Sequence, residues 1–199
     1  MLLALTAGFA INTHAANIVS DSGFENATLG PSSTTLGDGF WIVTGGAISV
    51  FDVANGEGGV PHSGNQMVYL DDQNTSNTVT QNLVTVVSQS YTVSYWVADN
   101  DPNSLVVNFG SQNLFTGFAP TAGVSVAGEY VNESFVVIAN STSTALSFTG
   151  HFLGGDGSYG TLLDDVSVTA NIAPEPSTWA FLAAGLGALK LWKQRSKVT

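Results

Sequence analysis

The chain has 199 residues and a formal net charge of −11, with 15 acidic residues and only four basic ones. All four basic residues lie in the last ten positions, so residues 1–189 contain neither Lys nor Arg. Binding to a nucleic-acid backbone requires basic side chains, and the acidic body at 1–189 has none, so nucleic-acid partners are excluded. The absence of cysteine excludes disulfides, thiolate metal sites and cysteine nucleophiles.

Residues 1–15 predict a signal peptide. An apolar run at 2–11 is followed by small residues, and Thr13-His14-Ala15 is a plausible cleavage motif. The basic region that usually precedes such a run is missing. A buried first strand or helix is the alternative interpretation.

Residues 17–170 predict one all-β domain. Short runs rich in Val, Phe, Tyr and Ile alternate with dense Gly, Ser, Thr, Asn and Asp, which is typical of short strands joined by turns. About ten such strands favour a two-sheet antiparallel sandwich of the jelly-roll type. The strands are expected at 40–44, 47–53, 66–72, 78–86, 89–99, 104–110, 112–117, 130–139, 144–152 and 161–170.

Three hairpins are expected between neighbouring strands. They would join 78–86 to 89–99 around Val87-Ser88, 104–110 to 112–117 at Gly110-Ser111, and 130–139 to 144–152. Within 89–99, one set of alternate positions is consistently apolar, which is the pattern of a half-buried strand. The residues expected to face the core are Tyr91, Val93, Tyr95 and Val97.

Asp164 is the acidic residue that most needs a partner. It shares its strand parity with the apolar residues Leu162, Val166 and Val168, so it is expected to face inward. Burial of an unpartnered carboxylate is costly. Two roles remain open: Asp164 binds an ion, or it accepts hydrogen bonds from backbone amides at a strand end. Asp165 is expected to face solvent.

No catalytic residues are predicted. Ser, His and Asp are all present, but the chain has no Gly-x-Ser-x-Gly nucleophile motif. His62, in the turn "PHSG", is interpreted as a solvated loop histidine. The pairs Asp71-Asp72 and Asp99 with Asp101 are interpreted as ordinary turn residues. The chain is therefore expected not to be an enzyme.

Two aromatic residues are candidates for a sugar-stacking platform. Most aromatics lie in strands and would build the core. Trp96, however, lies on the polar parity of its strand, and Tyr159 lies in the Gly-rich loop "GGDGSYG". An exposed ring at either position can contact the apolar C–H face of a sugar.

The C-terminus predicts a linker at 171–176, a short transmembrane helix at 177–192 and a basic cytoplasmic tail at 193–199. Basic residues that follow an apolar segment are retained on the cytoplasmic side. A spanning helix needs about 20 apolar residues, and the apolar run at 179–189 is shorter. A transient membrane stop is therefore expected more than a permanent anchor, with a core or amphipathic helix as the alternative. The basic cluster comprises Lys190, Lys193, Arg195 and Lys197.

This tail resembles the PEP-CTERM sorting signal of exported bacterial proteins. Pro174-Glu175-Pro176, the apolar run and the basic cluster stand in the order of that signal. The resemblance implies recognition by an exosortase, a membrane-embedded processing enzyme. It also implies an exported protein of the envelope, outer surface or extracellular matrix of a Gram-negative bacterium.

The body resembles galactose-binding-type jelly rolls, the fold of many carbohydrate-binding modules. The segments that carry the resemblance are "NIVSDSGFEN", "PHSGNQMVYLDD", "QSYTVSYWVADN" and "LLDDVSV". The resemblance implies a structural calcium that joins the first and last strands, with Glu25 and Asp164 at the ligand positions. It also implies extracellular polysaccharide as a partner, but it identifies no glycan-binding residue.

The sequence thus favours an exported, non-enzymatic protein that binds or organises extracellular polysaccharide. One alternative is a carbohydrate-active enzyme, a lyase or glycosidase of jelly-roll type. This is disfavoured because the body has no basic residue to neutralise a uronate and no evident carboxylate pair. The other alternative is a purely structural surface protein.

Overall fold

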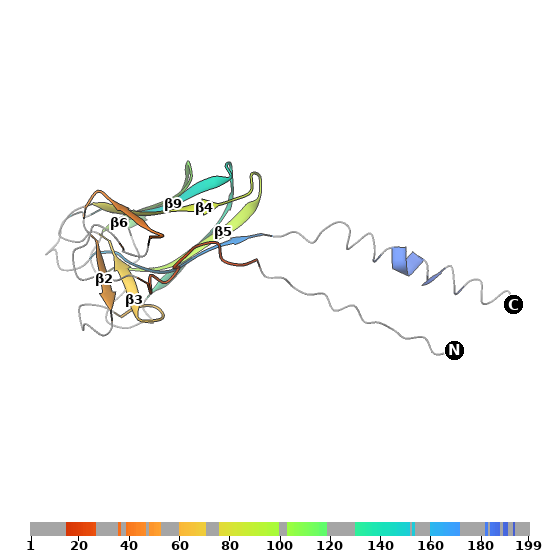
Figure 1. The fold of residues 1–199 in the computed structure, drawn as a ribbon, viewed down its shortest axis with the longest axis horizontal. Helices are drawn as coiled ribbons and strands as arrows, with labels where there is room; N and C mark the ends of the chain where they lie inside the picture. Colours follow the sequence, from red (N-terminus) through yellow and green to blue (C-terminus); the bar gives the residue numbers. More distant parts are fainter. Residues whose placement is uncertain are drawn as a thin grey trace.

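A β-sandwich forms the body of the protein (Figure 1). The computed structural model describes residues 15–26, 36, 39–46, 48–52, 60–70, 76–99, 103–118, 130–151, 153, 160–171 and, near the C-terminus, 182, 184–187, 189–190 and 193. Ten strands lie within these ranges, one in each predicted strand region. The all-β prediction is confirmed.

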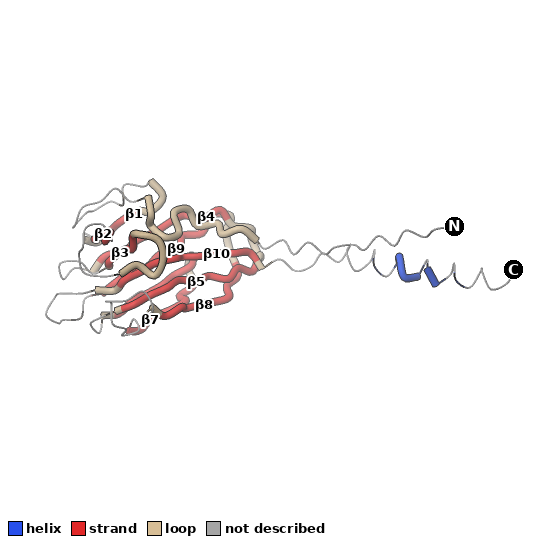
Figure 2. Tube along the Cα trace, turned by 90° about the horizontal axis from the view of Figure 1, so that it is seen from below, coloured by secondary structure: helices blue, strands red, loops and turns tan. Residues whose placement is uncertain are grey.

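Two five-stranded sheets make up the sandwich, and every pairing between their strands is antiparallel. The first sheet has the order β1-β4-β9-β6-β7, formed by Ile42–Thr44, Asn77–Val84, Ser143–His151, Ser104–Phe109 and Gln112–Phe118. The second has the order β2-β3-β10-β5-β8, formed by Ser49–Asp52, Gln66–Tyr69, Leu162–Ala170, Ser90–Ala98 and Val131–Ile138. Figure 2 shows β10 between β5 and β3.

Of the three predicted hairpins, only β6–β7 is confirmed, with its turn at Gly110-Ser111. The other two predictions are wrong, because β4 and β5 lie in different sheets, as do β8 and β9. The turn at Val87-Ser88 is present, with Ser88 at φ 66° and the Gln89 amide bonded to the Val86 carbonyl. It carries the chain from one sheet to the other instead of closing a hairpin.

The core lies between the sheets. The alternation predicted for β5 is confirmed, since Tyr91, Val93, Tyr95 and Val97 are all buried in the main apolar cluster. From the opposite sheet, Phe148 meets Tyr95 edge to face, with ring centroids 5.1 Å apart. Such interdigitation of the two inner faces is the usual core of a sandwich.

The chain enters and leaves the sandwich at the same end. Asn17 forms a bridge to Thr169 near the end of β10, and the Asn171 amide donates to the Ser90 carbonyl at the start of β5. We call this end, with the β4–β5, β6–β7 and β8–β9 connections, the exit end. Figure 1 places these connections on the side of the sandwich where β10 ends.

Near the C-terminus, helical backbone is described at 182, 184–187, 189–190 and 193. Among the residues that the structure covers, no helix has the length and apolar character needed to cross a bilayer. The helix expected at 177–192 therefore stays a prediction. Outside the described residues lie 1–14 of the signal peptide, the Pro174-Glu175-Pro176 motif, Tyr159, Arg195 and Lys197.

Candidate ligand-binding site

A second apolar cluster lies on the outer face of the β3-β10-β5-β8 sheet. Trp96 of β5 packs against it, half-buried. The loop at 61–65, which leads into β3, lies over this face and contacts Trp96 through His62. The buried members of this outer apolar cluster are Met67, Tyr69, Ala98, Tyr130 and Leu162.

A β-bulge in β10 places Asp164 on this outer face. Asp164 pairs in register with Trp96, and directly paired residues share a face of the sheet. The register then shifts between Asp164 and Ser167, where Asp165 adopts φ 48°. Val166 returns to the main core. The prediction that Asp164 is buried is confirmed, but the predicted face is wrong because a bulge adds a residue and inverts the alternation.

His62 is the centre of a set of long-range contacts. Its ring stacks on Trp96, with centroids 3.8 Å apart and planes 14° apart, and it meets the Tyr130 ring edge-on at 5.6 Å. Its Nδ1 lies 2.6 Å from Oδ2 of Asp165. The side chains of His62 and Asp165 are only 23% and 29% exposed. The prediction of a solvated His62 is therefore wrong, whereas Asp165, predicted to face solvent, is partly exposed and is also bonded to His62 and Ser63.

Glu25 and Asp164 hold the backbone of this same loop. Oε1 of Glu25 accepts the amides of Asn65 and Gln66 at 2.8 and 3.0 Å. Oδ2 of Asp164 accepts the Ser63 amide at 3.1 Å, and Oδ1 accepts the Asp165 amide at 2.7 Å. The backbone-acceptor role that the sequence left open for Asp164 is thus observed.

Burial dominates the electrostatics of Asp164. Desolvation raises the pKa of its carboxyl to about 7, and the neighbouring charge of Asp165 adds to this, while backbone hydrogen bonds, chiefly from Ser63, oppose it. The phenol of Tyr130 also has a raised pKa, first from burial and then from the charges of Asp164 and Asp165. This phenol stays neutral and donates to Sδ of Met67 at 2.8 Å.

The predicted calcium ligands lie in one neighbourhood. A β-carbon placed on Gly23 would lie 3.5–3.7 Å from atoms of the Asp165, Glu25 and Asp164 side chains. Within the described residues, however, no three His, Asp or Glu side chains form a group that could hold a metal ion. Calcium therefore stays a prediction.

Trp96, predicted as a sugar platform, has one ring face covered by His62. Sequence reasoning missed both His62 and Tyr130 as its neighbours. The only local signal was the "PHSG" turn, and nothing in the sequence pairs residue 62 with residue 96. Their contact results from the β10 register, which brings Asp164 and Asp165 beneath the loop.

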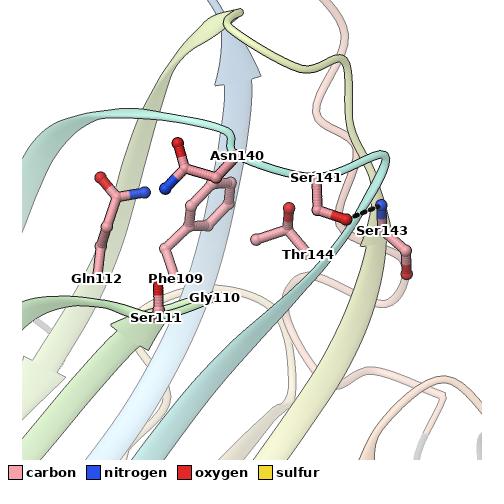
Figure 3. Close-up of a pocket in the computed structure, with 8 residues that line it drawn as sticks. All are labelled: Phe109, Gly110, Ser111, Gln112, Asn140, Ser141, Ser143 and Thr144. Carbon is pink, nitrogen blue, oxygen red and sulfur yellow. Dashed lines mark hydrogen bonds between the residues drawn. The ribbon is translucent and has the colours of Figure 1, made fainter.

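A separate pocket of about 120 Å³ opens at the exit end, between the β6–β7 turn and the β8–β9 connection. Figure 3 shows the carboxamides of Gln112 and Asn140 on one side and the hydroxyls of Ser141 and Thr144 on the other. No lining residue is charged. The lining residues are Phe109, Gly110, Ser111, Gln112, Asn140, Ser141, Ser143 and Thr144.

Known structures share this fold. The chain is similar to TmCBM61, solved in complex with β-1,4-galactotriose, with TM-score 0.58 and 17% identity over 79% of this chain and 100% of that one. It is also similar to part of the arabinose-bound α-L-arabinofuranosidase MgGH51, with TM-score 0.52 and 10% identity over 82% of this chain and 28% of that one. No family model and no curated protein matches the sequence. The likeness shows the jelly-roll fold.

Proposed function

We propose that this protein is exported and that its β-sandwich binds or organises extracellular polysaccharide without catalysing a reaction. The observation that carries the proposal is the fold match to TmCBM61, which extends over the whole of that chain. A match of this extent to a structure solved with a galactose oligosaccharide supports a carbohydrate as the ligand class.

The outer face around Trp96 is the proposed binding site. Its half-buried indole is held by the stack with His62, so a sugar would meet an ordered aromatic group at little entropic cost. Asp165 lies beside this pair and is partly exposed, and its carboxylate can accept hydrogen bonds from sugar hydroxyls. Tyr159 stays a second candidate platform.

For the C-terminal segment we propose sorting by an exosortase and transient membrane insertion, in the envelope of a Gram-negative bacterium. Support comes from the order of Pro174-Glu175-Pro176, an apolar run and a terminal basic cluster. The basic cluster would remain on the cytoplasmic side, which leaves the anionic body outside.

A structural calcium is part of the proposal. Glu25 and Asp164 would supply the hard oxygen ligands that calcium prefers, and bound calcium would join the segment at 23–25 to β10 and to the loop at 61–65. Calcium should then raise the melting temperature of the chain, and a chelator should lower it. Asp164→Ala should remove this response and Glu133→Gln on β8 should keep it. A melting curve that chelator leaves unchanged would refute the calcium site.

The decisive experiment for the main proposal is binding of the full chain, in detergent, to an array of galactan, xylan and arabinan oligosaccharides. Trp96→Ala should abolish binding, whereas Phe118→Ala, which removes an exposed aromatic from β7, should not. Equal binding by both variants would exclude the Trp96 site. Release of reducing ends from any of these glycans would overturn the non-enzymatic assignment.

A further inference from the structure

Five exposed aliphatic side chains lie toward the exit end of the sandwich. Val84 ends β4 and is 86% exposed, Val86 and Val87 lie in the β4–β5 connection, and Val136 and Ile138 lie in the last part of β8. Because these side chains are exposed, they contribute little to the core. Their exposure needs another explanation.

The same end carries no charge in the described residues. The segments that form it contain no Asp, Glu, Lys or Arg, in a chain whose net charge is −11. These segments are 15–19, 84–92, 107–114, 135–146 and 168–171. The described acidic residues lie away from this end, as Asp99 after β5 and Asp164 early in β10 illustrate. Within the described residues, the exit end therefore carries no charge that an anionic surface would repel.

The C-terminal segment starts from this end. Asn171 is bonded to Ser90, and only eight residue steps separate Asn171 from Trp179, where the apolar run begins. Even a fully extended chain covers no more than about 3.6 Å per residue, or roughly 30 Å in total. Insertion of the apolar run would therefore hold the exit end within about that distance of the membrane.

The pocket at this end fits the same surroundings. Its lining offers uncharged carboxamides and hydroxyls, including those of Gln112, Asn140 and Ser141 (Figure 3). Groups of this kind can exchange hydrogen bonds with lipid headgroups and glycerol esters. Apolar side chains beside neutral polar groups suit the bilayer interface, which is itself part apolar and part hydrated.

We propose that the exit end of the sandwich rests on the lipid surface while the C-terminal segment tethers the chain. The five aliphatic side chains enter the interface, and the acidic remainder of the body points away from it. This inference rests on the membrane role proposed above for the C-terminal segment. It sets the orientation of the body and leaves the face around Trp96 open to extracellular ligands.

Single-cysteine labelling tests the proposal directly, because the chain has no native cysteine. The full chain would be reconstituted with vesicles of phosphatidylcholine and phosphatidylglycerol and labelled with an environment-sensitive fluorophore at Val87→Cys. The matched control is Val131→Cys, another exposed valine, at the opposite end of β8. We expect a blue shift and quenching by brominated lipid at position 87 and neither at position 131.

The outcomes separate this proposal from the one on which it depends. If the chain fails to float with vesicles, the membrane role of the C-terminal segment is wrong, and the proposed orientation is refuted as well. If it floats but positions 87 and 131 respond alike, the orientation alone is refuted. A blue shift at position 87 without vesicles, together with a dimer in sedimentation, would assign this face to a second copy of the chain and overturn the lipid proposal. Val86→Asp should reduce the quenching at position 87 while flotation persists.

Discussion

His62 stacks on Trp96 with ring centroids 3.8 Å apart, although 34 positions separate them in the sequence. The contact fastens the loop before β3 to the outer face of β5. Trp96→Ala should lower stability by roughly 1–3 kcal/mol, because the loop loses this contact and the outer cluster loses packing. Trp96→Phe should keep most of this stability, because a phenyl ring can still stack on His62. Thermal unfolding of the three proteins measures this, and equal losses for Ala and Phe would show that ring stacking contributes nothing.

The raised pKa of Asp164 predicts a pH-dependent stability. In the folded chain this pKa is about 7, whereas the ordinary value is 3.8. Between these values the folded state binds more protons than the unfolded state. The contribution of this group to stability is therefore complete below about pH 4 and is lost as the pH rises to about 7.

Asp164→Asn removes this titration while an amide oxygen can still accept the Ser63 amide. In chelator, the melting temperature of the variant relative to the native chain should rise steadily from pH 4 to pH 7 and then level off. A constant difference across this range would show that Asp164 titrates normally.

Two tyrosines of β5 provide a matched pair. Both are buried in the core, but Oη of Tyr91 accepts the Val86 amide at 2.9 Å, whereas Oη of Tyr95 is buried with no hydrogen-bond partner in the described structure. Tyr95→Phe should stabilise the fold by about 1 kcal/mol, since an unpartnered buried hydroxyl is costly. Tyr91→Phe should destabilise it by a similar amount. Chemical denaturation measures both, and a loss of stability in Tyr95→Phe would show that its hydroxyl has a partner, such as a buried water.

Gly64 lies where the Glu25 carboxylate reaches the loop. It adopts φ +64°, and a β-carbon there would collide with the Glu25 carboxylate. Gly39 has a similar φ of +75°, with nothing within 4 Å of its β-carbon position. Gly39→Ala should therefore cost only the backbone strain, roughly 1–2 kcal/mol.

Gly64→Ala should cost at least about 1 kcal/mol more than Gly39→Ala, because Glu25 must release the amides of Asn65 and Gln66. Comparison of the two melting temperatures checks this. If both variants lose the same stability, the Glu25 contact contributes nothing to the loop.

Local patterns were enough to place all ten strands, because alternation and turn residues are short-range properties. These patterns did not determine which strands pair with each other. A tight turn such as Val87-Ser88 can close a hairpin or cross between sheets, and only the packing of whole strands decides which. The face of Asp164 was missed for a related reason, since the moderate preference of Asp for the left-handed conformation does not by itself predict a bulge at Asp165.

The candidate site was only partly predictable. Asp164 was identified because a carboxylate in an apolar row needs a partner. Trp96 was identified because it is an aromatic residue at one of the otherwise polar alternate positions of its strand. His62 was not connected to either, because its position depends on how the loop at 61–65 is held by Glu25, Asp164 and Asp165.

The position of β10 determines how the body bears mechanical load. The C-terminal segment follows β10 in the sequence. β10 is hydrogen-bonded to β5 along its length and to β3 at its start. A pull directed along the axis of β10 would load the β5–β10 hydrogen bonds in shear, together instead of one at a time. If the chain is held by its C-terminal segment, as proposed above, it is attached through an interior strand of its sheet.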